Sequence, residues 1–196
     1  MRSRLRFIFP ALAAYLIPAL ASAHPGHPGH DLEWDFQGGF LHPLSGLDHL
    51  VAMIAIGIWA AQLGGRARWL VPFSFVALMA LGGVVGRLGW PVPAVEQAIA
   101  ASVIVLGLLI ALAVRPPVAA GMGLAGLFAL FHGYAHGAEM PATAGALGYS
   151  FGFVVATALL HATGLALGLA TARLPSAATK TAGWAVAACG VFLLTT

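Results

Sequence analysis

The sequence predicts an all-α fold, a polytopic membrane helix bundle with six transmembrane helices after a cleaved signal peptide. Of the 196 residues, 60% are hydrophobic and only 8% are charged. Soluble domains carry roughly 25% charged residues, so this chain cannot cover a globular surface in water. The composition therefore excludes a cytosolic enzyme and a disordered protein. The nine Lys and Arg residues are scattered, so we expect a lipid bilayer and no nucleic acid as partner.

Residues 1–23 have the three parts of a secretory signal peptide. An apolar stretch over residues 7–20 follows a basic start and ends just before an A-x-A cleavage pattern. Two prolines inside the stretch disfavour the alternative, which is an uncleaved first membrane helix. Cleavage would leave the mature N-terminus in the periplasm. The basic residues of the start are Arg2, Arg4 and Arg6.

The mature chain would begin with a histidine-rich periplasmic segment, residues 24–39. His24, His27 and His30 recur at every third position among Pro and Gly. This composition is typical of flexible metal-binding tracts. We therefore expect these histidines to capture metal ions with moderate affinity, and the alternative is an incidental polar tail.

Six apolar segments follow, and each is interpreted as one membrane helix. A spanning helix needs about 20 apolar residues, and Gly, Pro and charged residues separate the segments. Together they make residues 40–196 one transmembrane domain. The predicted spans are 40–63, 69–88, 94–114, 118–140, 145–171 and 181–195.

The loop charges predict the orientation of the bundle independently of the signal peptide. With the N-terminus outside, the inner loops hold five basic residues and the outer loops hold only Arg87, as the positive-inside rule requires. We therefore expect a multi-pass protein of the bacterial cytoplasmic (inner) membrane, with both termini in the periplasm. The five inner residues are Arg66, Arg68, Arg115, Arg173 and Lys180.

The first span carries ionisable residues at membrane depth, where such groups are expensive and mark function. His42 and His49 are seven residues apart, which places them two turns apart on one face of a straight helix. Asp48 lies beside His49. Pro43 is expected in the first helical turn, where its missing N–H is tolerated.

The fourth span ends in a second group of potential ligands. His132, His136 and Glu139 share one helical face, because they are four and three residues apart. At 1.5 Å per residue, His49 lies about 13 Å and His132 about 12 Å from the outer surface. Antiparallel packing of the first and fourth spans would bring both groups into one site. His42 and Glu139 would form its outer mouth.

The fifth span carries His161 four residues after Thr157, on the same face. This histidine would lie roughly 20 Å from the outside, nearer the cytoplasm. Two interpretations stay open. His161 is an inner station on a metal path, or it donates a hydrogen bond to a neighbouring helix.

Imidazoles combined with carboxylates favour divalent first-row metals such as nickel, cobalt, zinc, iron and copper. The single cysteine, Cys189, excludes a multi-thiolate site. Oxygen-only sites for magnesium or calcium would not use so many histidines. A proton relay through buried His and Asp is also compatible with the sequence.

The chain resembles the hydrogenase and urease accessory permeases of the HupE/UreJ family over essentially its whole length. The resemblance implies a nickel permease, with cobalt as a second cargo, that supplies nickel-enzyme maturation proteins indirectly. It marks His42, Asp48, His49, His132, His136 and Glu139 as functional motif residues. The motifs are His42-Pro43-x-x-Gly46-x-Asp48-His49 and Phe131-His132-Gly133-x-Ala135-His136-Gly137-x-Glu139.

From these observations we expect a secondary permease, not an enzyme, that takes up Ni2+ and in second place Co2+ at an intramembrane His/Asp/Glu site. The sequence has no P-loop pattern, so we expect no ATP hydrolysis and no resident cofactor. One alternative is an intramembrane metal-dependent hydrolase that uses the same His/Asp cluster. Another is an assembly or sensor protein that binds metal without moving it. Small residues on the helices would permit homo-oligomers.

Overall fold

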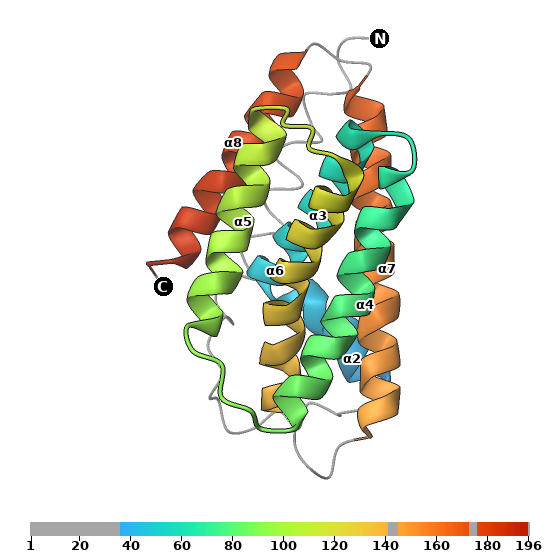
Figure 1. Ribbon diagram of the computed structural model, residues 1–196, viewed down its shortest axis with the longest axis vertical. Coiled ribbons are helices and arrows are strands. Elements are labelled where there is room, and N and C mark those ends of the chain that lie inside the picture. The colour runs from blue at the N-terminus through green and yellow to red at the C-terminus, as the bar shows by residue number, and fades with distance from the viewer. Residues whose placement is uncertain (1–35, 141–144, 173–175, 196) are drawn as a thin grey trace.

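The computed structural model describes residues 36–140, 145–172 and 176–195, and these ranges are all-helical, without a strand (Figure 1). The predicted signal peptide lies outside the described residues, as do His24, His27 and His30. The last residues of the predicted periplasmic segment, 36–39, already belong to the first described helix. The described helices are α2 (Phe36–Ser45), α3 (Leu47–Leu63), α4 (Ala67–Arg87), α5 (Val95–Ala111), α6 (Val118–Glu139), α7 (Ala146–Thr171) and α8 (Ser176–Leu193).

Three described helices, α4, α6 and α7, are each long and apolar enough to cross a membrane. A fourth span results if α2 and α3 are counted as one bent pair. Helix α5 is apolar but has only 17 residues, and the first turns of α8 carry polar side chains, including Lys180. The all-helical membrane character is therefore shown. The count of six spans stays a prediction.

The helices from α3 to α8 run alternately up and down the bundle, so successive connections lie at opposite ends (Figure 1). Arg66 and Arg115 belong to the α3–α4 and α5–α6 connections, which share one end. Arg87 ends α4 at the other end. Arg66 and Arg115 thus lie at one end of the bundle and Arg87 at the other, which is the separation that the loop charges predict.

Glycines allow the helix backbones to approach closely at the main packing contacts, which join α4 to α6, α3 to α7 and α5 to α8. Gly164 of α7 faces the carbonyl oxygen of Ile54 in α3, and a Cβ atom at position 164 would overlap it. Gly137 of α6 meets the backbone of Gly83 in α4 in the same way. Larger residues would separate these helices, as is common for tightly packed membrane helices.

Helix α3 lies in the core of the bundle. Met53, Ile56 and Trp59 are completely buried there. The indole N–H of Trp59 donates to the carbonyl oxygen of Val114 at 3.2 Å, just after α5. Because the Trp59 side chain is completely buried, the bond satisfies a donor that would otherwise be costly to bury, and it ties the end of α3 to the segment after α5.

The span predicted at 40–63 is not one straight helix, which corrects the sequence analysis. Helices α2 and α3 meet at an angle of 83°. Gly46 between them has extended backbone angles, with φ −84° and ψ 119°. Pro43 lies in the last turn of α2 and not in a first turn. Its missing N–H removes one bond from the helical ladder shortly before the chain turns.

The close contact at Gly164 predicts a test of the packing. Gly164→Val should lower the thermal midpoint of unfolding in detergent, because overpacking costs about 1–3 kcal/mol. Gly123→Val is the matched control, since no atom lies within 4 Å of the position that its Cβ would take. Equal midpoints for the two variants would contradict the observed α3–α7 packing.

Candidate metal centre

Asp48 holds the ring of His49 in the first turn of α3. Its Oδ1 accepts the backbone N–H of His49 at 2.8 Å and lies 2.7 Å from Nδ1 of the same residue. A carboxylate is an acceptor only, so Nδ1 carries the proton in this pair. The lone pair of a neutral His49 ring is then at Nε2. Carboxylate–imidazole pairs of this kind orient metal-binding histidines in proteins.

Gly46 leaves the room that this pair needs. A Cβ atom at position 46 would lie 2.8 Å from Oδ1 of Asp48 and 3.3 Å from Nδ1 of His49. The backbone angles of Gly46 are open to any residue, so the space around it, and not its flexibility, explains the glycine. The break between α2 and α3 and the Asp48–His49 pair are therefore parts of one local arrangement.

Four imidazoles converge from three helices. His136 of α6 lies between His42 of α2 and His49 of α3, with ring centroids 4.5 Å and 4.3 Å away. The Nε2 atoms of His136 and His49 approach to 2.5 Å. His132, one turn earlier on α6, has its ring centroid 4.9 Å from that of His49. His49, His132 and His136 are buried, and His42 is half-buried.

The two sequence motifs thus meet, but the helices that carry them do not pack directly against each other as expected. Helix α3 packs mainly against α7, and α6 packs mainly against α4. The backbones of α3 and α6 make only a few close approaches, so long imidazole side chains span the distance between them. His42 and His49 also lie close, with centroids 6.2 Å apart, across a bend and not along one helical face.

Glu139 lies exposed at the end of α6. One ligand atom each from His42, His136 and Glu139 fall within 4.8 Å of one another, a separation that one metal ion could bridge. The structure therefore brings the two residues of the predicted outer mouth, His42 and Glu139, to the same place. Their role as ligands stays a prediction.

His132 and His161 lie deeper, and both contact Phe75 of α4. The Phe75 ring centroid is 5.8 Å from that of His132 and 5.1 Å from that of His161. Neither ring nitrogen of His161 has a hydrogen-bond partner within the described residues. The hydrogen bond to a neighbouring helix that we considered for His161 is therefore not found in this part of the chain.

Sequence reasoning missed several residues that contact the histidines. Phe153 of α7 lies 4.4 Å from His136 between ring centroids and forms an apolar wall. Phe75 of α4 contacts both His132 and His161. Ser102 of α5 lies 3.0 Å from Nε2 of His132. Phe75 and Ser102 belong to no spacing pattern with the histidines. Phe153 lies eight residues before His161 on α7 but contacts His136 of α6, so only the folded arrangement identifies these contacts.

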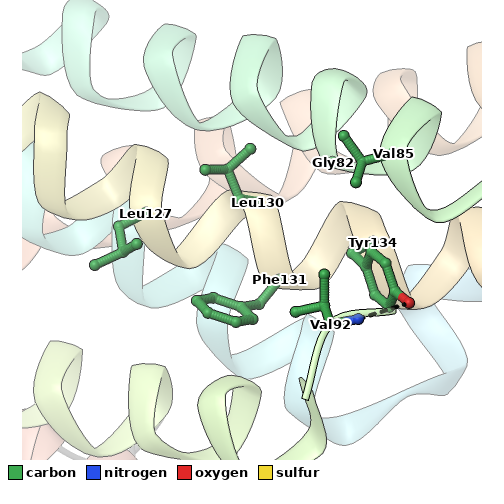
Figure 2. A pocket seen from close by; sticks show the side chains of 7 residues that line it. All are labelled: Gly82, Val85, Val92, Leu127, Leu130, Phe131 and Tyr134. Carbon is green, nitrogen blue, oxygen red and sulfur yellow. Dashed lines mark hydrogen bonds between the residues drawn. The ribbon is translucent and has the colours of Figure 1, made fainter. Parts of the chain in front are cut away.

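A separate hollow of about 270 Å³ lies against α4 and α6, and no histidine lines it (Figure 2). Tyr134 points into this hollow. Its hydroxyl donates to the carbonyl oxygen of Trp90 at 2.7 Å and accepts the N–H of Val92 at 3.3 Å. Although Tyr134 stands between His132 and His136 in the sequence, its hydroxyl is thus bonded to the segment before α5.

Chemical crosslinking can test the geometry of the cluster without any metal. In a Cys189→Ser background, a short bifunctional thiol reagent should join the pair His42→Cys and His136→Cys, because the two rings face each other with centroids 4.5 Å apart and the reagent replaces the length of the lost imidazoles. Loss of both free thiols without formation of a covalent dimer would report the intramolecular link. The control pair uses Leu41→Cys with His136→Cys, since Leu41 is 49% exposed. Equal crosslinking of both pairs, or of neither, would contradict the placement of His42.

Comparisons with known proteins agree with the resemblance of the motifs. A family model described as "HupE / UreJ protein" matches residues 12–193. "Protein HupE" of Rhizobium leguminosarum bv. viciae is 46% identical over 191 residues, which cover 95% of this chain and 96% of that protein. No solved structure matches the chain significantly. The chain belongs to the HupE/UreJ family.

Proposed function

We propose that this chain is a secondary permease that carries divalent transition-metal ions across the bacterial cytoplasmic membrane, with Ni2+ as the first cargo and Co2+ as the second. The observation that carries the proposal is the convergence of four imidazoles from α2, α3 and α6 inside apolar helices. Membership of the HupE/UreJ family supports it, because the motif resemblance links that family to nickel and cobalt.

Buried imidazoles without partners favour a ligand-binding role over a structural one. Nδ1 of His132 and Nδ1 of His136 are buried and have no hydrogen-bond partner within the described residues. Leaving such an atom without a hydrogen bond costs about 1–3 kcal/mol of folding free energy. Ionisable groups are rare in membrane helices unless they have a function. A metal ion would recover this cost, and nitrogen donors with carboxylates suit Ni2+ and Co2+.

The rings form a continuous file that would serve as the path of the ion. His42 and Glu139 would receive it, with the predicted tract His24, His27 and His30 gathering ions outside. The file continues through His136, His49 and His132 to Phe75 and His161. Neighbouring ring centroids along it lie between 4.3 and 5.8 Å apart.

The charge distribution supports a mouth that opens to the periplasm. The mouth lies at the end of the bundle where α6 stops and α7 starts, opposite the connections that carry Arg66 and Arg115 (Figure 1). The positive-inside rule assigns those connections to the cytoplasm. The mouth would then open to the periplasm, and His161, 15 residues into α7, would be the inner station.

Loss of a converging imidazole should stop transport. In proteoliposomes, His136→Ala should lower the rate of Ni2+ influx at least tenfold, because even outer-shell partners of metal ligands are worth about 10–100-fold. Tyr134→Phe is the control on the same helix and should keep the wild-type rate, since its hydroxyl is bonded outside the cluster. Wild-type influx in His136→Ala would contradict the proposal. Lipid turnover without influx would indicate the intramembrane hydrolase instead.

The membrane potential should drive the influx. Two charges that cross 100 mV gain about 4.6 kcal/mol, twice the value for one charge. A potassium diffusion potential that makes the vesicle interior negative should therefore increase the initial rate of Ni2+ uptake, and an interior-positive potential should decrease it. Rates that do not respond to the sign of the potential would exclude uncoupled movement of the divalent cation.

A further inference from the structure

Ser102 is a buried hydroxyl on an apolar helix, and it contacts a candidate metal ligand of another helix. Beyond its first turn, α5 has no other polar side chain. The side chain of Ser102 is completely buried. Its Oγ lies 2.6 Å from the carbonyl oxygen of Ile99 in the same helix and 3.0 Å from Nε2 of His132 in α6. The direction of these two hydrogen bonds can be derived from their chemistry.

A serine hydroxyl has one hydrogen, and a carbonyl oxygen can only accept. The short distance to Ile99 therefore requires the hydroxyl hydrogen to point at that carbonyl. The contact with His132 must then run the other way, so that Nε2–H of His132 donates and Oγ of Ser102 accepts. A neutral imidazole has only one N–H. The lone pair of His132 is consequently at Nδ1, the atom that is buried without a partner within the described residues.

We propose that Ser102 is a positioning residue that sets the tautomer of His132 and thereby presents Nδ1 to the transported ion. This inference rests on the proposed function, because it takes His132 as a metal ligand. Metal-binding histidines commonly donate their second ring N–H to a neighbouring acceptor, which fixes the ring and its basicity. Ser102 supplies this acceptor from α5, a helix that carries none of the sequence motifs.

The positioning of His132 complements that of His49. Asp48 accepts from Nδ1 of His49 and leaves the lone pair at Nε2, the atom that faces Nε2 of His136. Ser102 accepts from Nε2 of His132 and leaves the lone pair at Nδ1. The two rings are 4.9 Å apart between centroids and stand at 86° to each other. Opposite tautomers therefore leave one lone pair on each of two adjacent rings.

Ser74 of α4 provides a matched control for a purely structural role. It is also a buried serine on an apolar helix, and its Oγ donates to the carbonyl oxygen of Val71 at 2.8 Å. Its second contact is the carbonyl oxygen of Met122 at 3.3 Å, not a histidine. Ser74→Ala thus removes a serine hydroxyl that donates to a carbonyl oxygen of its own helix, as Ser102→Ala does. It leaves the contact between Ser102 and His132 in place.

Nitrogen-15 NMR of histidine-labelled protein in bilayers, without metal, tests the tautomer directly. The His132 signals are assigned as those lost in His132→Asn. We expect a protonated Nε2 and an unprotonated Nδ1 in the wild type, in Ser102→Thr and in Ser74→Ala, and a mixture of tautomers in Ser102→Ala. A protonated Nδ1 in the wild type, or an unchanged spectrum in Ser102→Ala, would overturn the inference.

Equilibrium binding of Ni2+ to the same purified proteins then tests the consequence. Ser102→Ala should weaken binding about 10–100-fold, the usual effect of losing an outer-shell partner, and Ser102→Thr should restore most of the affinity. Ser74→Ala should bind like the wild type. Equal affinities of wild type and Ser102→Ala would overturn the role of Ser102 and leave the proposed permease intact. A wild type that binds no Ni2+ would overturn both.

Discussion

Ring nitrogens of four buried histidines, His49, His132, His136 and His161, lie among apolar helices away from water, and this constraint organises the bundle. Two of these atoms have acceptors supplied by the chain, since Asp48 takes Nδ1–H of His49 and Ser102 takes Nε2–H of His132. Others face one another or remain without a partner among the described residues. A cluster that keeps lone pairs free in an apolar setting loses stability unless a cation occupies it for part of the time. The same ring nitrogens therefore account both for the free-energy cost of burying them and for the proposed binding of a metal ion.

The packing of the bundle makes this convergence geometrically possible. The bend at Gly46 places His42 and His49 on either side of His136, which a straight helix would not do. Glycine contacts hold α6 against α4 and α7 against α3, so the backbones that carry the histidines are fixed by neighbours other than each other. The rings then bridge the remaining gap between α3 and α6. Substitutions at these glycines should consequently affect the cluster at a distance.

Much of the fold could be predicted from apolar runs and their breaks, since α4, α6 and α7 begin and end within about two residues of the predicted spans. The bend at Gly46 could not, because Pro43 and Gly46 fit a first turn equally well. The folded chain shows that α2 begins before the predicted span, where Gly39 packs against Tyr149 and Phe36 against Gly152 of α7. The histidine and carboxylate groups were predicted from helical spacing and do lie together. Ser102 was missed because a single serine forms no helical spacing pattern in the sequence. Its role depends on which ring it contacts in the folded chain.

X-ray absorption at the nickel K-edge tests the central claim, that these imidazoles bind the transported ion, most directly. The sample is the full chain with His24, His27 and His30 replaced by alanine, so that only the membrane cluster can contribute histidines. The account predicts multiple scattering from several imidazole ligands at the bound Ni2+, and a loss of that signal when His49 and His136 are both replaced by alanine. A nickel spectrum with oxygen ligands alone, or one that this double replacement leaves unchanged, would contradict it.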